Sequence, residues 1–235
     1  MSAAGIDSIH GLNVAVHVAA GLLALGLGLW QLLARKGDAA HRRRGVWAWR
    51  VAVPCVASAL LGALVFRPSP DLVAVSLLVG YHLYGGRRCL PLARNGRAWA
   101  DWGVAALLLL VALGLVLAPG LGWGLHWEPV RARAVAASMA LIGVYDLVRI
   151  AFPPAWRRFL NPAEHAWRLC SMVGAMAGVL AAQRLPGPVA AQVSLSVSGA
   201  FGLWACIAAW QAARKALGVQ PSQALKARLN TDSAL

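Results

Sequence analysis

The chain has 235 residues, of which 60% are hydrophobic and 13% are charged, whereas soluble domains average about 25% charged residues. This composition excludes an ordinary water-soluble domain, because so few charged side chains cannot cover a soluble core. The formal net charge of +14 would suggest nucleic acid if Lys and Arg formed one face or tail, but they lie in short clusters between apolar segments, which excludes that partner.

The apolar residues form about seven blocks, each long enough to cross roughly 30 Å of hydrocarbon as an α-helix. The sequence therefore predicts an all-α, polytopic transmembrane helix bundle, with residues 1–217 in a single domain. In chain order, the predicted spans are 12–33, 46–66, 72–90, 102–118, 132–151, 166–183 and 189–210. Residues 218–235 are polar and are predicted to be a disordered cytoplasmic tail.

The basic residues predict the orientation of these spans. Most of the 22 Lys and Arg residues fall in the loops on one side and in the tail. Because cytoplasmic loops are enriched in Lys and Arg, the amino terminus is predicted outside and the carboxyl terminus in the cytoplasm. Tryptophans such as Trp30, Trp47 and Trp123 lie at span ends, where indole rings prefer the headgroup zone. Anionic lipid headgroups are the partners that these basic loops predict.

Ionisable side chains inside a bilayer are costly, so they are the first candidates for function. His17 lies in the first predicted span and His82 midway along the third. Two imidazoles from facing helices would ligate a b-type heme. The two histidines lie at different depths at about 1.5 Å per residue, which opposes this pairing. The alternative for His17 is a hydrogen bond to a backbone carbonyl of a neighbouring helix.

A second group of polar residues falls at the predicted cytoplasmic side of the fifth and sixth spans. Its members are Asp146, Arg149, Glu164, His165 and Arg168, joined by His41 of the first loop. In one hypothesis, His41, Asp146, Glu164 and His165 bind a divalent metal or relay protons. In the other, Arg149 and Arg168 form structural ion pairs with the carboxylates and lock two helices together.

Other residues give less support to particular chemistries. Asp101 lies at a span boundary beside Trp99 and Trp102, and it is expected to be a solvated residue at a helix start. The four cysteines are scattered singly, which is typical of small packing residues rather than disulfides or zinc ligands. The sequence has no HExxH, GxSxG, P-loop or GxGxxG motif, so it assigns no enzymatic activity.

Several motifs resemble a group of bacterial multi-pass membrane proteins known only as a domain of unknown function. They are His17-x-x-x-Gly21, Lys36-Gly37-x-x-x-His41-Arg42-x-x-Gly45, Tyr145-Asp146-x-x-Arg149, and His165-x-x-Arg168 followed by Gly174-Ala175. The resemblance covers roughly residues 13–185 and does not include His82. Leu169 departs from it, since similar sequences often have methionine there. It implies no activity, because none is established for that group.

Three functional hypotheses follow. In the first, the polar residues form a metal, heme or proton-relay site in a seven-helix protein of the bacterial inner membrane. In the second, the chain is a non-catalytic scaffold or accessory subunit that binds a membrane-protein partner or a second copy. The third is a seven-helix zinc hydrolase similar in layout to alkaline ceramidases, although the HxxxH pair expected of those is missing.

Overall fold

The computed structural model describes residues 3–34, 38–95, 99–117, 129–149 and 154–182, together with residues 152, 185, 189, 192, 193, 196, 197, 199–204 and 207. Within this part of the chain every regular element is a helix, which confirms the predicted all-α class. The elements in chain order are α1 (Ala3–Leu33), α2 (Ala39–Leu61), η1 (Gly62–Phe66), α3 (Pro70–Asn95), α4 (Trp99–Leu117), α5 (Pro129–Val148) and α6 (Pro154–Ala182).

The first two helices form an antiparallel hairpin. Asp38 caps the start of α2, because its carboxylate accepts a hydrogen bond from the backbone N–H of His41 at 2.5 Å. α2 contains Pro54 and continues into η1, a single π-helical turn. The hairpin also packs on α6 at Gly28, where an added Cβ would lie 2.5 Å from a methyl group of Val173. A small residue at this position therefore permits the close approach of α1 and α6.

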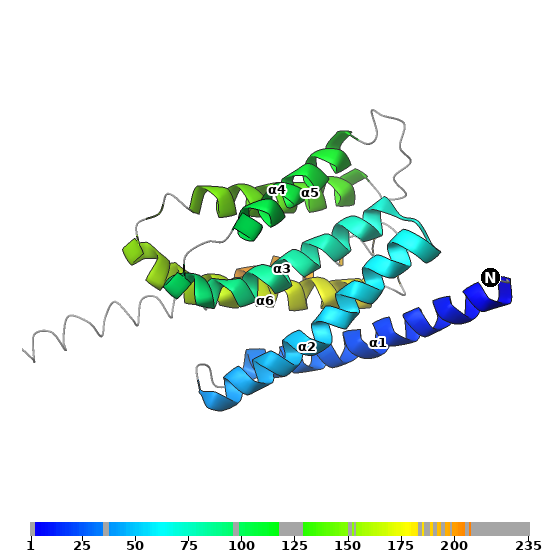
Figure 1. Cartoon of the computed structure of the whole chain (residues 1–235), viewed down its shortest axis with the longest axis horizontal. Coiled ribbons are helices and arrows are strands. Elements are labelled where there is room, and N and C mark those ends of the chain that lie inside the picture. Colours follow the sequence, from blue (N-terminus) through cyan, green and yellow to red (C-terminus); the bar gives the residue numbers. More distant parts are fainter. Residues whose placement is uncertain are drawn as a thin grey trace, which may run out of the picture.

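α3 and α6 lie side by side in the middle of the molecule, between the α1–α2 hairpin and the α4–α5 pair (Figure 1). α3 contributes to both apolar clusters of the core. One cluster joins it to α4 and α5 around Leu108 and Met139, and the other joins it to α1, α2 and α6 around Ala24 and Val173. Polar residues on α3 are consequently placed to meet side chains from most of the other helices.

The outer surface of the helices is strongly apolar. Leu22, Leu23, Leu110 and Leu141 are all more than half exposed. Among the described residues, three segments are long and apolar enough to cross a membrane, namely Asp7–Leu33, Ala39–Phe66 and Trp99–Leu117. An exposed apolar surface on helices of this length is what a hydrocarbon solvent requires, so these segments support a membrane protein.

The helices differ from the predicted spans mainly at their starts. α1 begins at Ala3 and α2 at Ala39, upstream of the predicted residues 12 and 46, because a helix continues beyond its apolar stretch. α6 begins at Pro154 rather than at residue 166, and Pro162 lies inside it. Proline is well tolerated in the first turn of a helix, so Pro154 starts a helix where the sequence predicted a break. In the predicted span 189–210, the described residues are helical, and the predicted tail lies outside the described residues.

Candidate functional site

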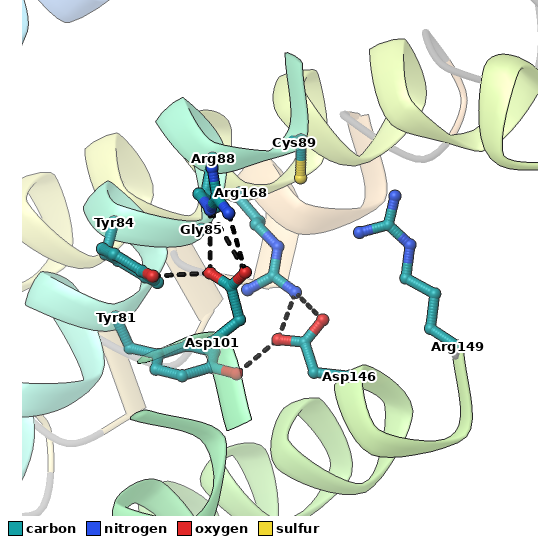
Figure 2. A pocket seen from close by; sticks show the side chains of 9 residues that line it. All are labelled: Tyr81, Tyr84, Gly85, Arg88, Cys89, Asp101, Asp146, Arg149 and Arg168. Atoms are coloured by element: carbon teal, nitrogen blue, oxygen red, sulfur yellow. Dashed lines mark hydrogen bonds and ion pairs between the residues drawn. The ribbon is translucent and has the colours of Figure 1, made fainter. Parts of the chain in front are cut away.

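One face of α3 carries several of the residues from which the site is built. They are Tyr81, Tyr84, Gly85, Arg88 and Cys89. Spacings of three and four residues place them along one side of the helix. This face meets polar side chains of α4, α5 and α6 around a small cavity (Figure 2). We refer to these polar side chains together as the α3–α6 network. Its members are Tyr81, Tyr84, Arg88, Cys89, Asp101, Tyr145, Asp146, Arg149, Asn161, Glu164 and Arg168.

The first part of the network is an ion pair between α5 and α6. Nη2 of Arg168 lies 2.6 Å and 2.7 Å from the two carboxylate oxygens of Asp146. The hydroxyl of Tyr81 donates to the same carboxylate, so α3, α5 and α6 meet at one point. Arg168 is 0% exposed, and its guanidinium lies over the Tyr81 ring, 5.4 Å from the centroid.

Gly85 makes room for this arginine. A Cβ added at Gly85 would lie 2.5 Å from Nη1 and 2.9 Å from both Cδ and Cζ of Arg168. These distances are far shorter than a van der Waals contact, and they involve the middle of the side chain as well as its end. Glycine at this position therefore allows the Arg168 side chain to lie between α3 and α6.

The second part joins α3 to α4. Arg88 binds Asp101 through two nitrogen atoms, with Nε 2.9 Å from Oδ1 and Nη2 3.0 Å from Oδ2. The Tyr84 hydroxyl donates to Oδ1 of Asp101 at 2.5 Å. Asp101 lies in the first turn of α4, as expected, but it is only 8% exposed, so the expectation that it is solvated is wrong. The carboxylate is buried because Arg88, Tyr84 and the first turn of α4 supply the interactions that water would otherwise make.

The third part lies just beyond α5. Nη1 of Arg149 is 2.5 Å from Oε2 of Glu164, and its Nη2 donates to the amide oxygen of Asn161. Glu164 also accepts from the hydroxyl of Tyr145 and from the thiol of Cys89, the latter at 3.2 Å. Arg149 and Glu164 are 4% and 5% exposed, which makes this a second ion pair shielded from solvent.

The formal charges of the network cancel, because three arginines pair with three carboxylates. An unpaired charge in this position would carry a large desolvation cost, whereas a paired one recovers much of it. The cavity that Asp101, Asp146 and Arg168 line has a volume of about 20 Å³, close to the roughly 10–15 Å³ that one water molecule needs. Protonatable carboxyl and phenol groups thus line one cavity of the size of a water molecule.

No family model, curated protein or solved structure matches the chain. The resemblance to a bacterial family of unknown function therefore stays a prediction.

The structure brings together four residues that the sequence grouped. Asp146, Arg149, Glu164 and Arg168 all belong to the network and form the two ion pairs described above. His165 lies next to it on α6, where its Nδ1 is 2.7 Å from the backbone carbonyl of Gly86. His41 lies at the start of α2, where its backbone bonds to Asp38 and Gln31. These two backbone hydrogen bonds lie within the α1–α2 hairpin.

The two histidines proposed as heme ligands contact different helices. Nδ1 of His17 lies 3.1 Å from the backbone carbonyl of Cys55 on α2, the alternative role that the sequence analysis considered. His82 is buried on α3 and packs edge-on against Trp167 of α6, with ring centroids 5.6 Å apart. These contacts do not bring the two imidazoles to a common heme, and the heme pairing stays a prediction.

The donor set of the network also fits a metal ion poorly. Asp146 and Glu164, the carboxylates of the predicted metal site, are each bound by an arginine, which competes directly with a cation. Over the described part of the chain, no group of three or more His, Cys, Asp or Glu side chains could hold a metal ion.

Several residues of the network were not singled out from the sequence. They are Tyr81, Tyr84, Arg88, Cys89, Tyr145 and Asn161, and Asp101 was assigned to the surface. A signal for the α3 members was present: Tyr81, Tyr84 and Arg88 recur at helical spacing within an apolar block. The positions of Tyr145 and Asn161 relative to Glu164 depend on how α5 and α6 pack, which the sequence does not encode locally.

Proposed function

We propose that the α3–α6 network is a proton-relay site within a multi-pass protein of the bacterial inner membrane. The observation that carries this proposal is the pair Asp101 and Asp146. Each carboxylate accepts from a tyrosine hydroxyl and an arginine, and both line one cavity of the size of a water molecule. Carboxyl and phenol groups exchange protons through hydrogen bonds and water, and buried carboxyl groups within membrane helices commonly serve such relays.

The proposal includes seven spans with the amino terminus outside and the carboxyl terminus in the cytoplasm. α3, α5 and α6 have 26, 20 and 29 residues, and about 20 residues suffice to cross the hydrocarbon. They are less apolar than α1 and α4 because they carry most of the network. A cytoplasmic reporter tests the orientation: green fluorescent protein fused after the last residue should fluoresce, whereas an active alkaline phosphatase fusion at that point would overturn it.

Stacked arginine and tryptophan side chains support this orientation. The guanidinium of Arg44 lies 5.1 Å from the Trp30 ring, and that of Arg87 lies 4.1 Å from the Trp49 ring. All four residues belong to the side predicted to face the cytoplasm. A layer of arginine and indole at one level is typical of a headgroup boundary, where the arginines would bind anionic lipids.

Proton flux into vesicles tests the relay. The full chain is purified in detergent, reconstituted into liposomes that enclose a pH-sensitive dye, and exposed to a potassium diffusion potential set by valinomycin. The wild-type chain should acidify the lumen faster than protein-free vesicles. Asp146→Asn keeps the shape of the side chain but removes its ability to ionise, and it should reduce the rate to that of protein-free vesicles.

Asp38→Asn is the matched control, because it makes the same chemical change at an exposed residue outside the network. Asparagine also caps a helix well, so α2 should keep its start and the proton flux should be unchanged. Tyr81→Phe provides a second variant that removes only one hydroxyl, in case Asp146→Asn does not fold. Wild-type flux no faster than that of empty vesicles would contradict the proposal.

A second candidate, the non-catalytic scaffold or accessory subunit, is favoured by a different observation. Three arginines and three carboxylates cancel in charge, and Arg168 has no exposed surface, as expected for residues that only join helices. This function predicts that vesicles show no protein-dependent flux, while Asp146→Asn still lowers the free energy of unfolding. A membrane-protein partner or a second copy would then copurify from mild detergent.

A further inference from the structure

Arg168 has more hydrogen-bond donors than acceptors around it. Its Nη2 binds Asp146, but Nε and Nη1 have no acceptor among the described residues. Because Arg168 is 0% exposed, these nitrogens cannot reach bulk water or lipid headgroups. Buried donors are nearly always bonded, so the unbonded Nη1 at the end of this buried guanidinium points to a ligand that can accept a hydrogen bond.

The cavity next to this guanidinium identifies the size of that ligand. Arg168, Asp101, Asp146 and Gly85 are among the residues that line it, and its volume is about 20 Å³. In Figure 2 the Arg168 guanidinium lies between the carboxylates of Asp101 and Asp146. This space suits a single water molecule, which needs roughly 10–15 Å³ and several polar partners.

The charges around the cavity identify the chemical class of the ligand. A small anion would accept from Arg168, but each arginine that lines the cavity is already paired with a carboxylate. An anion would therefore add an uncompensated buried charge. An apolar occupant would leave the arginine donors unbonded. A water molecule fits this volume and can accept from the guanidinium and donate to a carboxylate at the same time.

We infer that this cavity is a binding site for one structural water molecule, which accepts a hydrogen bond from Nη1 of Arg168 and donates to the carboxylate of Asp101. Asp101 is the assigned acceptor because Asp146 already contacts Arg168 directly through Nη2. The water joins the Arg88–Asp101 pair to the Arg168–Asp146 pair. Its functional role rests on the proposed relay, in which this water molecule is the group that connects the two carboxylates.

A crystal structure of the full chain in detergent or lipid, at a resolution that shows ordered water, tests the site directly. We expect a density peak at about 2.7–3.2 Å from Nη1 of Arg168 and at hydrogen-bond distance from a carboxylate oxygen of Asp101. Gly85→Ala should remove the peak, because the added Cβ takes the place now held by Nη1 and displaces the guanidinium. Gly103→Ala is the matched control, since its Cβ would meet nothing within 4 Å, and it should keep the peak.

Two results would overturn the inference. One is a well-ordered Arg168 in its present position with no density in the cavity of the wild-type chain. The other is an anomalous peak in the cavity of crystals grown with bromide, which would assign an anion instead of water. Failure of the relay can be distinguished from failure of the water site. A water peak without proton flux contradicts only the proposed function, and proton flux without the water peak contradicts only the water site. The wild-type structure decides the matter even if Gly85→Ala does not fold.

Discussion

The α1–α2 hairpin and the α3–α6 network satisfy their buried polar side chains in different ways. In the hairpin, neutral side chains bond to backbone carbonyls: Asn13 donates to the carbonyl of Ser58 at 3.1 Å, and the His17 ring lies 3.1 Å from that of Cys55. In the network, arginines bond to carboxylates that are themselves bonded to tyrosines. In the hairpin, polar side chains join one helix to another, whereas in the network several charged side chains are buried together.

This difference predicts how strongly each region depends on its polar side chains. A neutral side chain that loses its partner leaves one polar group in hydrocarbon, but a charged side chain leaves an ion, so the network depends on all of its members. The first two motifs that carry the family resemblance fall in the hairpin, at residues such as His17 and His41. The buried carboxyl and phenol groups on which the proposed relay rests lie in the other region.

The largest expected effect is that of Arg168→Met. Methionine keeps much of the side-chain volume but leaves Asp146 buried without its cation, and breaking a buried pair in this way costs about 3–5 kcal/mol. The free energy of unfolding is measured by titrating the detergent-solubilised protein with sodium dodecyl sulfate and following tryptophan fluorescence.

Arg43→Met is the control for this substitution, because Arg43 is exposed near the start of α2. It should change the free energy of unfolding by less than about 0.5 kcal/mol. If Arg168→Met cost no more than this control, the network would not be a stabilising unit and the contrast with the hairpin would be lost.

Arg88→Gln should have a smaller effect than Arg168→Met. Glutamine keeps a donor near Asp101 but removes the charge and the two-pronged geometry, and hydrogen bonds to charged groups contribute about 1.5–3 kcal/mol. The Arg88 side chain is 25% exposed, so water and headgroups partly replace it and the lower end of that range is expected. The same unfolding titration measures the loss of free energy. An effect as large as that of Arg168→Met would show that water and headgroups do not replace the Arg88 side chain beside Asp101.

Much of the helical architecture follows from the sequence, because apolar length and helix breakers are local properties. The predicted spans 46–66 and 102–118 end close to the observed ends of η1 and α4. The predicted spans leave residues 152–165 outside any helix, whereas α6 begins at Pro154, because Pro153 and Pro154 together are typical of a break between helices and proline is also tolerated in a first turn. A proline pair marks a boundary without saying how soon the next helix starts.

The site was only partly predictable, for a physical reason. Asp146, Arg149, Glu164 and Arg168 could be grouped because they are charged residues within or beside apolar blocks. Asp101 was assigned to the surface because tryptophans flank it, but its burial depends on the approach of Arg88 from α3. Which carboxylate meets which arginine is set by helix packing, and helix packing depends on small residues such as Gly85 that carry no charge signal.

The smallest expected effect is that of Asn13→Leu in the hairpin. The substitution removes one side-chain hydrogen bond to a carbonyl that already belongs to a helix, and such bonds between membrane helices average about 0.6 kcal/mol.

A double-mutant cycle sharpens the comparison. Asn13→Leu and Arg168→Met should add within about 0.3–0.5 kcal/mol, because their residues share no bonding partner in the described contacts. Arg88→Gln and Arg168→Met, in contrast, should couple by at least about 0.5 kcal/mol if the cavity joins them into one network. The opposite pattern, with coupling to the hairpin and none across the cavity, would mean that the division of the molecule drawn from its contacts is wrong.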